Sequence, residues 1–396
     1  MSNVNYFNNQ INVDGKKILL RLDLNVPLNN KSILDYTRIE IVLPFIKNLL
    51  KKNSRLILLS HLGRPKGVKD NNLSLIPVYK YLKKQFKNNL YFFAGDIDHE
   101  TKNKISYLKN GEIVLVENIR FNKGEEQNDG VFAKTLANLC DIYINDAFSC
   151  CHRKQASVHK ITEYSKYNYA GPLIKKEIEA IDLLIKNKKE PITCLIGGSK
   201  ISTKINVLLN LIKKVNNIVI IGAMANNFLL YKNYGIGKSL VEKNITEIIK
   251  QIYTEAKINE CKIIIPEDFN VSKSFHGKPT TKGQNDIDSE DIILDIGPKT
   301  LLKIKEIIEG SKTVMWNGPA GYFENLNFAN GTFSIAKIIS DRISNKSLLS
   351  VVGGGDTITA INKSKKTFSF THLSTAGGAF LEYLEGKDLP GISVLK

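Results

Sequence analysis

The sequence of 396 residues has no apolar run of the 18 or so residues that cross a bilayer. Its first ten residues, MSNVNYFNNQ, also lack the basic segment and apolar core of a signal peptide. The five cysteines form no CxxC pair and are odd in number, which favours free thiols in a reducing compartment over a disulfide framework. These absences predict a cytoplasmic protein with no membrane partner.

Arginine is scarce in a chain that is rich in lysine. Only seven of the 56 basic side chains are arginines, namely Arg21, Arg38, Arg55, Arg64, Arg120, Arg153 and Arg342. Where lysine supplies the simple positive charges, a remaining arginine indicates a need for the planar guanidinium fork, which binds a carboxylate or phosphate through two hydrogen bonds. We interpret Arg55 and Arg342 as surface residues and the others as candidates for anion binding.

The formal net charge of +17 raises the hypothesis of a nucleic-acid partner, because such binding depends on neutralising phosphates. The basic residues are spread along the whole chain, however, without a basic arm or a basic stretch interleaved with aromatics. We therefore interpret the charge as a lysine-rich coding bias and expect no specific nucleic-acid partner. A basic nucleic-acid-binding protein remains the alternative, and a salt titration of oligonucleotide binding distinguishes the two.

Short β-branched runs alternate with stretches of helical period, which is the pattern of βα units around a parallel sheet. In the first half we predict strands at 18–22, 56–59, 91–93, 113–116 and 142–144. In the second half we predict strands at 192–196, 218–221, 262–265, 292–294, 314–316 and 348–352. The predicted fold class is α/β, with two doubly wound, Rossmann-like parallel-sheet domains. The predicted boundaries are 1–171 for the N-terminal domain, 172–187 for a connecting helix and 188–388 for the C-terminal domain.

Most of the predicted strands end in glycine or polar residues, and doubly wound sheets bind ligands at the carboxyl ends of their strands. The glycine segment 353–358 (GGGDTI) is not a dinucleotide fingerprint, because Ile358 replaces the last glycine and Asp356 would repel a pyrophosphate. Gly237-Lys238-Ser239 is not a P-loop, because Lys232 stands where its first glycine belongs. A dehydrogenase and a P-loop enzyme are thus disfavoured.

The segment GGSKISTK (197–204) has the composition of a phosphate-binding turn. We predict that it follows a strand and opens a helix, so that free backbone amides face a ligand. Lys200 and Lys204 would then lie one helical turn apart and converge on one phosphate. A second tight turn, WNGPAG at 316–321 with Glu324 after it, would let a flat ligand approach the backbone.

Taken together, twelve segments in one order resemble the phosphoglycerate kinase family nearly end to end. They are RLDLNVP (21–27), DYTRI (35–39), SHLGRP (60–65), ENIRF (117–121), NDAFSCCHR (145–153), AGPLIKKEI (170–178), GGSKISTKI (197–205), GAMANNFL (222–229), DIGPKT (295–300), VMWNGPAGYFE (314–324), VVGGGDT (351–357) and THLSTAGGAFLEYLEGKDLPGI (371–392). The resemblance implies reversible transfer of a phosphoryl group between ATP and the carboxylate of 3-phosphoglycerate, a step of glycolysis.

The resemblance implies that the N-terminal domain binds 3-phosphoglycerate or 1,3-bisphosphoglycerate. Five of the seven arginines lie in the matching segments, in agreement with the argument from composition. The implied substrate-binding residues are Asp23, Asn25, Arg38, His61, Leu62, Gly63, Arg64, Arg120 and Arg153.

The resemblance further implies that the C-terminal domain binds ATP or ADP with Mg²⁺. The implied nucleotide-binding residues are Lys200, Lys204, Asn317, Glu324, Gly354, Gly355, Asp356 and Thr357, with Glu324 on the ribose and Asp356 as the metal ligand. The implied catalytic residues are Arg38, Lys204, Gly354 and Gly377. No general base is expected, since the attacking carboxylate is already ionised, and transfer depends on alignment and charge stabilisation.

A monomer is also implied, whose residues 389–396 pack on the N-terminal domain and whose domains close around the substrates. The chain departs from the usual family sequence at Ser149-Cys150, at Ser199 and at Ala376, where the family has the first of three glycines. Ala376 matters most, because a positive φ at that position would suit only glycine. An inactive scaffold on the same fold is a further alternative, disfavoured because every charged family residue is present.

Overall fold

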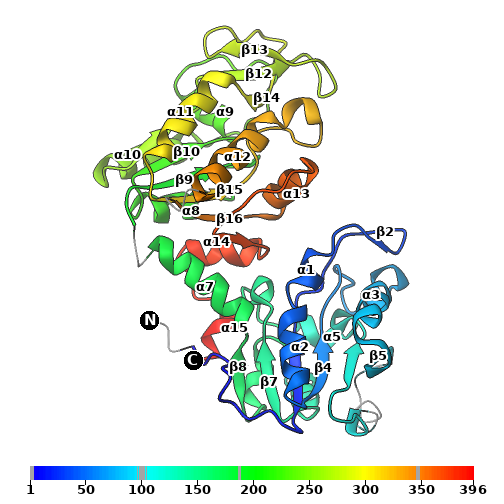
Figure 1. The fold of residues 1–396 in the computed structure, drawn as a ribbon. Helices are drawn as coiled ribbons and strands as arrows, with labels where there is room; N and C mark the ends of the chain where they lie inside the picture. The colour runs from blue at the N-terminus through cyan, green and yellow to red at the C-terminus, as the bar shows by residue number, and fades with distance from the viewer. Residues whose placement is uncertain (1–3, 96, 98–102, 104, 186–188, 345–347) are drawn as a thin grey trace. The chain divides into compact units, whose positions relative to one another are not determined.

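The structure is a computed structural model that describes residues 4–95, 97, 103, 105–185, 189–344 and 348–396. The chain divides into two compact units, Met1–Ile178 with Asp388–Lys396, and Glu179–Lys387. Each unit is built on a six-stranded parallel sheet (Figure 1), which confirms the predicted fold class. The predicted connecting helix is α7 (Pro172–Ile185), and predicted residues 186 and 187 lie outside the described part.

The sheet of the first unit has the strand order β5-β6-β4-β1-β7-β8. Its strands are β1 (Lys17–Arg21), β4 (Arg55–Leu59), β5 (Leu90–Phe93), β6 (Ile113–Val116), β7 (Ile142–Asn145) and β8 (Asn168–Ala170). Its helices are α1 (Thr37–Glu40), α2 (Leu43–Lys51), α3 (Ile76–Phe86), α5 (Lys123–Glu126), α6 (Gly130–Ala137) and α15 (Pro390–Ser393). The first five strands form within a residue of the predicted positions.

The sheet of the second unit has the order β11-β10-β9-β15-β16-β17. Its strands are β9 (Ile192–Ile196), β10 (Asn217–Ile220), β11 (Lys262–Ile264), β15 (Thr313–Asn317), β16 (Leu349–Gly353) and β17 (His372–Ser374). Its helices are α8 (Ile205–Ile212), α9 (Ala225–Tyr231), α10 (Thr246–Ile258), α11 (Pro298–Glu309), α12 (Asn330–Ser344), α13 (Gly355–Lys363) and α14 (Gly378–Leu384).

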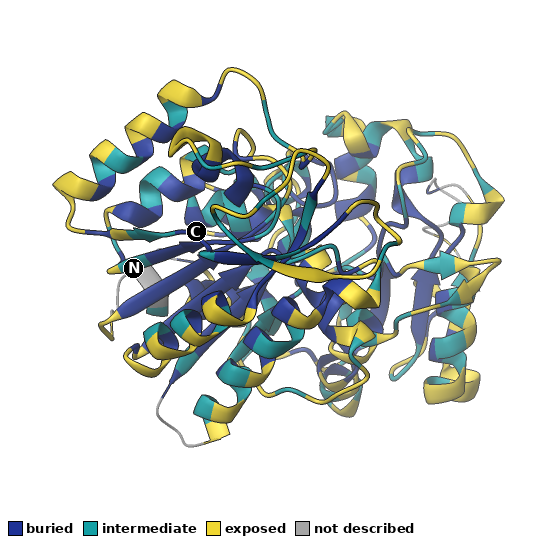
Figure 2. Cartoon of the chain, turned by 90° about the horizontal axis from the view of Figure 1, so that it is seen from above, coloured by how far each residue is buried: buried dark blue, intermediate teal, exposed yellow. Residues whose placement is uncertain are grey.

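Helices cover both sheets, so the central strands are buried on both faces, as is usual for parallel sheets. All five residues of β9 and of β15 are buried. Figure 2 shows most strands of the two parallel sheets as buried and the helices as buried on one side and exposed on the other. This arrangement leaves the strand ends as the places where polar side chains gather.

The prediction that 292–294 belongs to the second parallel sheet is wrong. The strand forms as β14 (Ile292–Ile296), but it pairs antiparallel with β12 (Asp268–Ser272) in a separate sheet of order β13-β12-β14. β13 (Thr280–Gly283) follows β12 after a short connection, which suits an antiparallel pair and is too short for a parallel crossover. The short pair β2 (Leu28–Asn29) and β3 (Ser32–Ile33) forms another small sheet.

Residues at the end of the chain lie in the first unit. The amide of Asn5 donates to the carbonyl of Leu395 at 2.7 Å, and the amide of Gly391 donates to the carbonyl of Cys151 at 2.9 Å. All five cysteines are free thiols, as predicted. No helix in the described residues is long and apolar enough to span a bilayer.

Candidate active site

In the first unit, Asp23 and Asn25 stand just beyond β1 and organise the end of the sheet. Asp23 Oδ2 accepts hydrogen bonds from Arg38 Nη1 at 2.6 Å and from Ser149 Oγ at 2.5 Å. Burial opposes ionisation of Asp23, but the Arg38 guanidinium holds the pKa of this carboxyl below its ordinary value. An ionised Asp23 therefore fixes the position of Arg38 on α1.

The segment after β4 is tied into the same cluster. Asn25 Oδ1 accepts from the amide of Gly63 at 2.9 Å, and Arg120 Nη1 donates to the carbonyl of Gly63 at 2.8 Å. Leu62 is buried, and its carbonyl accepts from Asn118 Nδ2 at 2.7 Å. Arg38 Nη1 also donates to the carbonyl of Asn25 at 3.2 Å, so Asp23, Asn25, Arg38, Gly63 and Arg120 form one continuous network.

His61 lies in this cluster as a buried, uncharged ring. Burial lowers its pKa well below the ordinary value, and the nearby Arg21 opposes protonation further. Arg21 Nη2 lies 3.3 Å from His61 Nδ1, and Arg21 Nε donates to Ser157 Oγ at 2.9 Å. The interpretation of Arg21 as an anion-binding residue is therefore wrong, because its side chain is fully buried and bonds within the core, where it orients His61.

The two remaining predicted arginines are placed differently. Arg64 is exposed and directly follows Gly63, whereas Arg153 is half-buried and its Nε donates to His152 Nε2 at 3.0 Å. Burial lowers the pKa of Arg120, and the positive charges of Arg21 and Arg153 contribute to that lowering. Cationic groups are thus concentrated at this end of the sheet, an arrangement suited to an anionic ligand.

In the second unit, Lys204 lies directly before α8 and reaches back over two strand ends. Its Nζ donates to the carbonyl of Gly197 and to Asn317 Oδ1, the latter at 2.7 Å. Burial lowers the pKa of Lys204 from 10.5 to about 8, although the Asp356 carboxylate acts in the opposite direction. Lys204 is therefore a largely desolvated cation beside β9 and β15.

The turn between β16 and α13 is tied to the same residues. Asn317 Nδ2 donates to the carbonyl of Gly353 at 3.0 Å, and Thr357 Oγ1 donates to that carbonyl at 2.9 Å. Gly354 has φ +101°, and a Cβ there would lie 2.8 Å from Asn317 Nδ2, so this position requires glycine. Gly355 then starts α13, which directs its first amides toward this end of the sheet.

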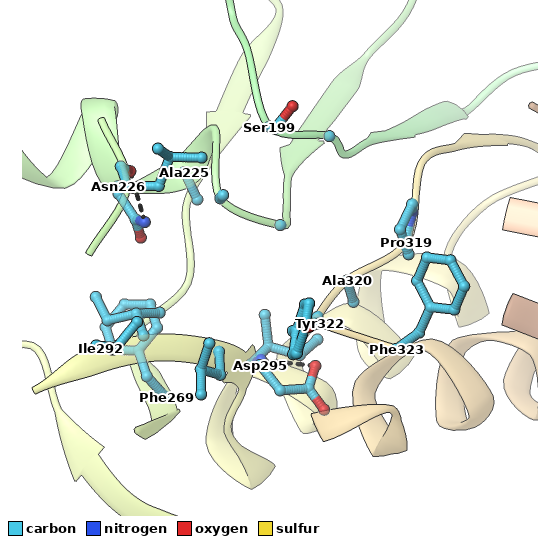
Figure 3. A pocket seen from close by; sticks show the side chains of 18 of the residues that line it. Ser199, Ala225, Asn226, Phe269, Ile292, Asp295, Pro319, Ala320, Tyr322 and Phe323 are labelled. Atoms are coloured by element: carbon cyan, nitrogen blue, oxygen red, sulfur yellow. Dashed lines mark hydrogen bonds between the residues drawn. The ribbon is translucent and has the colours of Figure 1, made fainter. Parts of the chain in front are cut away.

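A pocket of about 380 Å³ opens beside this turn. Figure 3 shows Ser199, Ala225 and Asn226 on one side of it and Phe269, Ile292 and Asp295 on the other. Its wall is mostly apolar, with the exposed carboxylates of Glu324 and Asp356 among the lining residues. Lys200, Lys204, Asn317, Gly354, Gly355 and Thr357 are not part of this lining.

The predicted helical spacing of Lys200 and Lys204 is wrong. Residues 198–201 have no regular structure, residues 202–204 form a turn, and α8 begins only at Ile205. The amides of Ile201 and Ser202 donate instead to Glu242 Oε2, at 2.5 and 3.1 Å. A carboxylate of the protein therefore occupies the amides that were expected to face a phosphate.

The backbone position that needs glycine is 377 and not 376. Gly377 has φ +56° and lies directly before α14, whereas Ala376 is not among the residues with positive φ. The amide of Ala376 donates to Ser374 Oγ at 3.3 Å. The departure at 376 thus imposes no backbone strain. Among the described residues, no hydrogen bond joins Gly377 to Lys204 or Asn317.

Sequence reasoning did not find three residues of these clusters. Asp295 lines the pocket, and burial raises its pKa to about 7; its carboxylate accepts from the amides of Ile296 and Gly331 at 2.9 and 2.8 Å. Its presence in the DIGPKT segment was a signal that could have found it. Ser149 likewise lies in the NDAFSCCHR segment, whereas Glu242 had no such signal, because its role depends on a contact between segments far apart in sequence.

Across the described residues no three His, Cys, Asp or Glu side chains gather in a group that could hold a metal. A magnesium ion held by one carboxylate together with phosphates and waters needs no such group. Asp356, which is exposed in the first turn of α13, is a suitable oxygen ligand of that kind.

Comparisons with known proteins agree with this geometry. The family model described as phosphoglycerate kinase matches residues 8–387. Phosphoglycerate kinase of Wolbachia pipientis wMel is 44% identical over 383 residues, 96% of each chain, and that of Chelativorans sp. (strain BNC1) is 43% identical over 387 residues, 97% of each chain. The structure of phosphoglycerate kinase from Coxiella burnetii superposes with a TM-score of 0.85 at 37% identity over 97% of each chain. The resemblance seen in the sequence is confirmed, and the chain belongs to the phosphoglycerate kinase family.

Proposed function

We propose that this phosphotransferase of glycolysis carries out its reaction, ATP plus 3-phosphoglycerate to ADP plus 1,3-bisphosphoglycerate and the reverse, with the two clusters described above. One observation carries the proposal: cationic side chains lie at the strand ends of each parallel sheet, and hydrogen bonds fix their positions. They are Arg38 and Arg120 in one unit and Lys204 in the other. We also propose a cytoplasmic monomer that acts on small molecules, without a nucleic-acid partner. The five free thiols support a reducing compartment.

The first cluster is proposed to bind the phosphoglycerate. That ligand carries a carboxylate and a phosphate, and both are anions that guanidinium groups bind in preference to other partners. Asp23 fixes the orientation of Arg38, and the Gly63 bonds fix Arg120. Neutral His61 can offer a hydrogen bond without adding charge. Asn25, Leu62, Gly63, Arg64 and Arg153 complete the proposed substrate residues.

The second cluster is proposed to bind the nucleotide. The mostly apolar pocket suits a nucleobase, and Glu324 among its lining residues suits the hydroxyls of a ribose. Lys204 and Lys200 would neutralise phosphate charge, while Asn317 and Thr357 hold the turn that presents Gly354 and Gly355. The amides at the start of α13, with that of Gly377, would stabilise phosphate oxygens.

Asp356 is proposed to hold the Mg²⁺ that accompanies the nucleotide. Its carboxylate is exposed on the pocket, and Mg²⁺ prefers hard oxygen ligands. When bound, the ion would spread the negative charge of the phosphates.

The chemistry proposed for these residues is charge stabilisation and alignment. A carboxylate oxygen of 3-phosphoglycerate attacks the γ-phosphorus of ATP, the bond from that phosphorus to the bridging oxygen breaks, and ADP leaves. The nucleophile is ionised at neutral pH, so no residue has to remove a proton. Arg38 and Lys204 would neutralise charge on the transferred group, the main requirement of phosphoryl transfer.

Arg38→Ala tests the assignment in the first unit. We expect turnover to fall by roughly 10²- to 10³-fold, the usual effect of removing one charge-stabilising group from such a site. The assay is the magnesium- and ATP-dependent phosphorylation of 3-phosphoglycerate, coupled to reduction of the acyl phosphate. Arg342→Ala is the matched control, since that arginine on α12 donates to the carbonyl of Glu309 at the end of α11, and neither residue belongs to the proposed site. Unchanged turnover in Arg38→Ala would remove Arg38 from the mechanism.

A further inference from the structure

The turn that carries Lys204 is held in place by one acidic side chain from a distant segment. Glu242 Oε2 accepts from the amides of Ile201 and Ser202 at 2.5 and 3.1 Å, and Oε1 accepts from Ser202 Oγ at 2.5 Å. The side chain of Ile201 is fully buried, so the turn is anchored on its other side by the core. Lys204 follows two residues after Ser202 and lies directly before α8.

Glu242 is itself held rigidly. Its amide donates to Asn227 Oδ1 at 2.9 Å, and Asn226 Nδ2 donates to the carbonyl of Leu240 at 3.0 Å. Both asparagines belong to α9, and both are buried. Leu240 is also a lining residue of the pocket. The segment 240–242 therefore borders the pocket through Leu240 and holds the turn before Lys204 through Glu242.

The charge of Glu242 suits a structural ligand of the turn. Burial opposes its ionisation, but the hydrogen bonds from Ser202 and Ile201, with the charge of Lys200, hold its pKa below the ordinary value. Amides that bond a carboxylate are not offered to a phosphate, so this part of the turn contributes geometry and Lys204 contributes charge. Three bonds to one carboxylate fix the path of the backbone through 201 and 202.

We propose that Glu242 is a positioning residue for phosphoryl transfer, which acts by fixing the turn 201–204 so that Lys204 is directed toward the transferred group. This inference rests on the proposed role of Lys204. Small displacements of a charge-stabilising group lower the rate strongly, because its contact is strongest in the transition state. Loss of Glu242 should therefore reduce kcat much more than it changes the KM for either substrate.

The test compares Glu242→Ala with Glu242→Gln. Alanine removes all three bonds. Glutamine keeps an oxygen that can accept from both amides, while its NH₂ group can donate to Ser202 Oγ, whose hydroxyl rotates to accept. We expect kcat to fall by about 10- to 100-fold in Glu242→Ala, with each KM within about threefold of wild type, and to be largely restored in Glu242→Gln. Glu290→Ala is the matched control, because that exposed acid of the same unit pairs only with Lys238 among the described ion pairs.

The possible results separate this inference from the proposed function. If Lys204→Met is inactive and Glu242→Ala keeps wild-type kcat, Glu242 has no positioning role and the role of Lys204 stands. If Lys204→Met keeps wild-type kcat, the proposed function of Lys204 fails first. If Glu242→Gln is as slow as Glu242→Ala, charge and not geometry matters, and the inference is overturned. Thermal melting of each variant shows whether it is folded, and a kcat loss that merely follows the folded fraction would also overturn it.

Discussion

Lys204→Met should make the second unit slightly more stable at neutral pH while it removes activity. The folded-state pKa of Lys204 is lowered from 10.5 to about 8 by burial. The unfolded chain therefore binds this proton more readily. The buried charge lowers the free energy of unfolding of wild type by its full amount below about pH 8, and this destabilisation is lost as the pH rises toward 10.5. The difference between 10.5 and about 8 corresponds to roughly 3 kcal/mol of unfolding free energy.

The hydrogen bonds of Lys204 offset part of that cost. Methionine has a similar volume but leaves the carbonyl of Gly197 and Asn317 Oδ1 without this donor. Each lost bond costs about 1 kcal/mol. The variant should therefore be more stable than wild type by about 1 kcal/mol at pH 7 and less stable by about 2 kcal/mol above pH 10.5.

The single tryptophan allows the stability of the second unit to be measured. Trp316 is buried in β15, next to Asn317, and its fluorescence reports unfolding of the second unit. Urea titrations of both proteins between pH 7 and 10 give the difference in unfolding free energy, most of whose change should be complete by pH 10. A difference that does not vary with pH would refute the argument that Lys204 is a desolvated cation. In the kinase assay we expect turnover to fall by roughly 10²- to 10³-fold.

Two further substitutions test the nucleotide side. Asp356→Asn should raise by at least about tenfold the Mg²⁺ concentration that gives half-maximal activity, because an amide is a weaker ligand for a hard cation; a titration of Mg²⁺ at fixed ATP measures this, and an unchanged requirement would contradict it. Glu324→Ala should raise the KM for ATP by about tenfold, the loss of one hydrogen bond to a charged group, and leave the KM for 3-phosphoglycerate unchanged. Equal effects on both KM values would show that Glu324 acts on the fold and not on the nucleotide.

The strands that the sequence predicted well are those whose signal is local. β9 and β15 are continuous apolar runs because they are buried on both faces, so their composition identifies them. β8 and β17 have only three residues each and lie at sheet edges, where partial exposure removes the pattern. The residues of β14 predict a strand, but its antiparallel pairing with β12 is a contact between distant segments that composition does not show.

The same division between local and distant signals applies to the site. Asp23 and Asn25 could be found because polar residues at the end of a buried strand are conspicuous in one sequence. The helix predicted after Gly198 begins only at Ile205, because Glu242, 40 residues from Ser202 in sequence, accepts from the amides of Ile201 and Ser202 and holds this segment outside the helix. The prediction for Arg21 failed for a related reason. Its guanidinium is buried and bonds Ser157, a residue distant in sequence, and does not face an anion site.

The two proposed charge-stabilising residues are prepared for their ligands in opposite ways. Arg38 is paired with an ionised Asp23, so its charge is compensated before any substrate arrives and its orientation is fixed. Among the described residues, the hydrogen-bond acceptors of Lys204 are the neutral oxygens of Gly197 and Asn317, and burial makes its charge unfavourable until an anion approaches. A phosphate would relieve that cost, so Lys204 gains more from its ligand than Arg38 does. The desolvation that destabilises the second unit is therefore the same property that would make Lys204 effective on a transferred phosphoryl group.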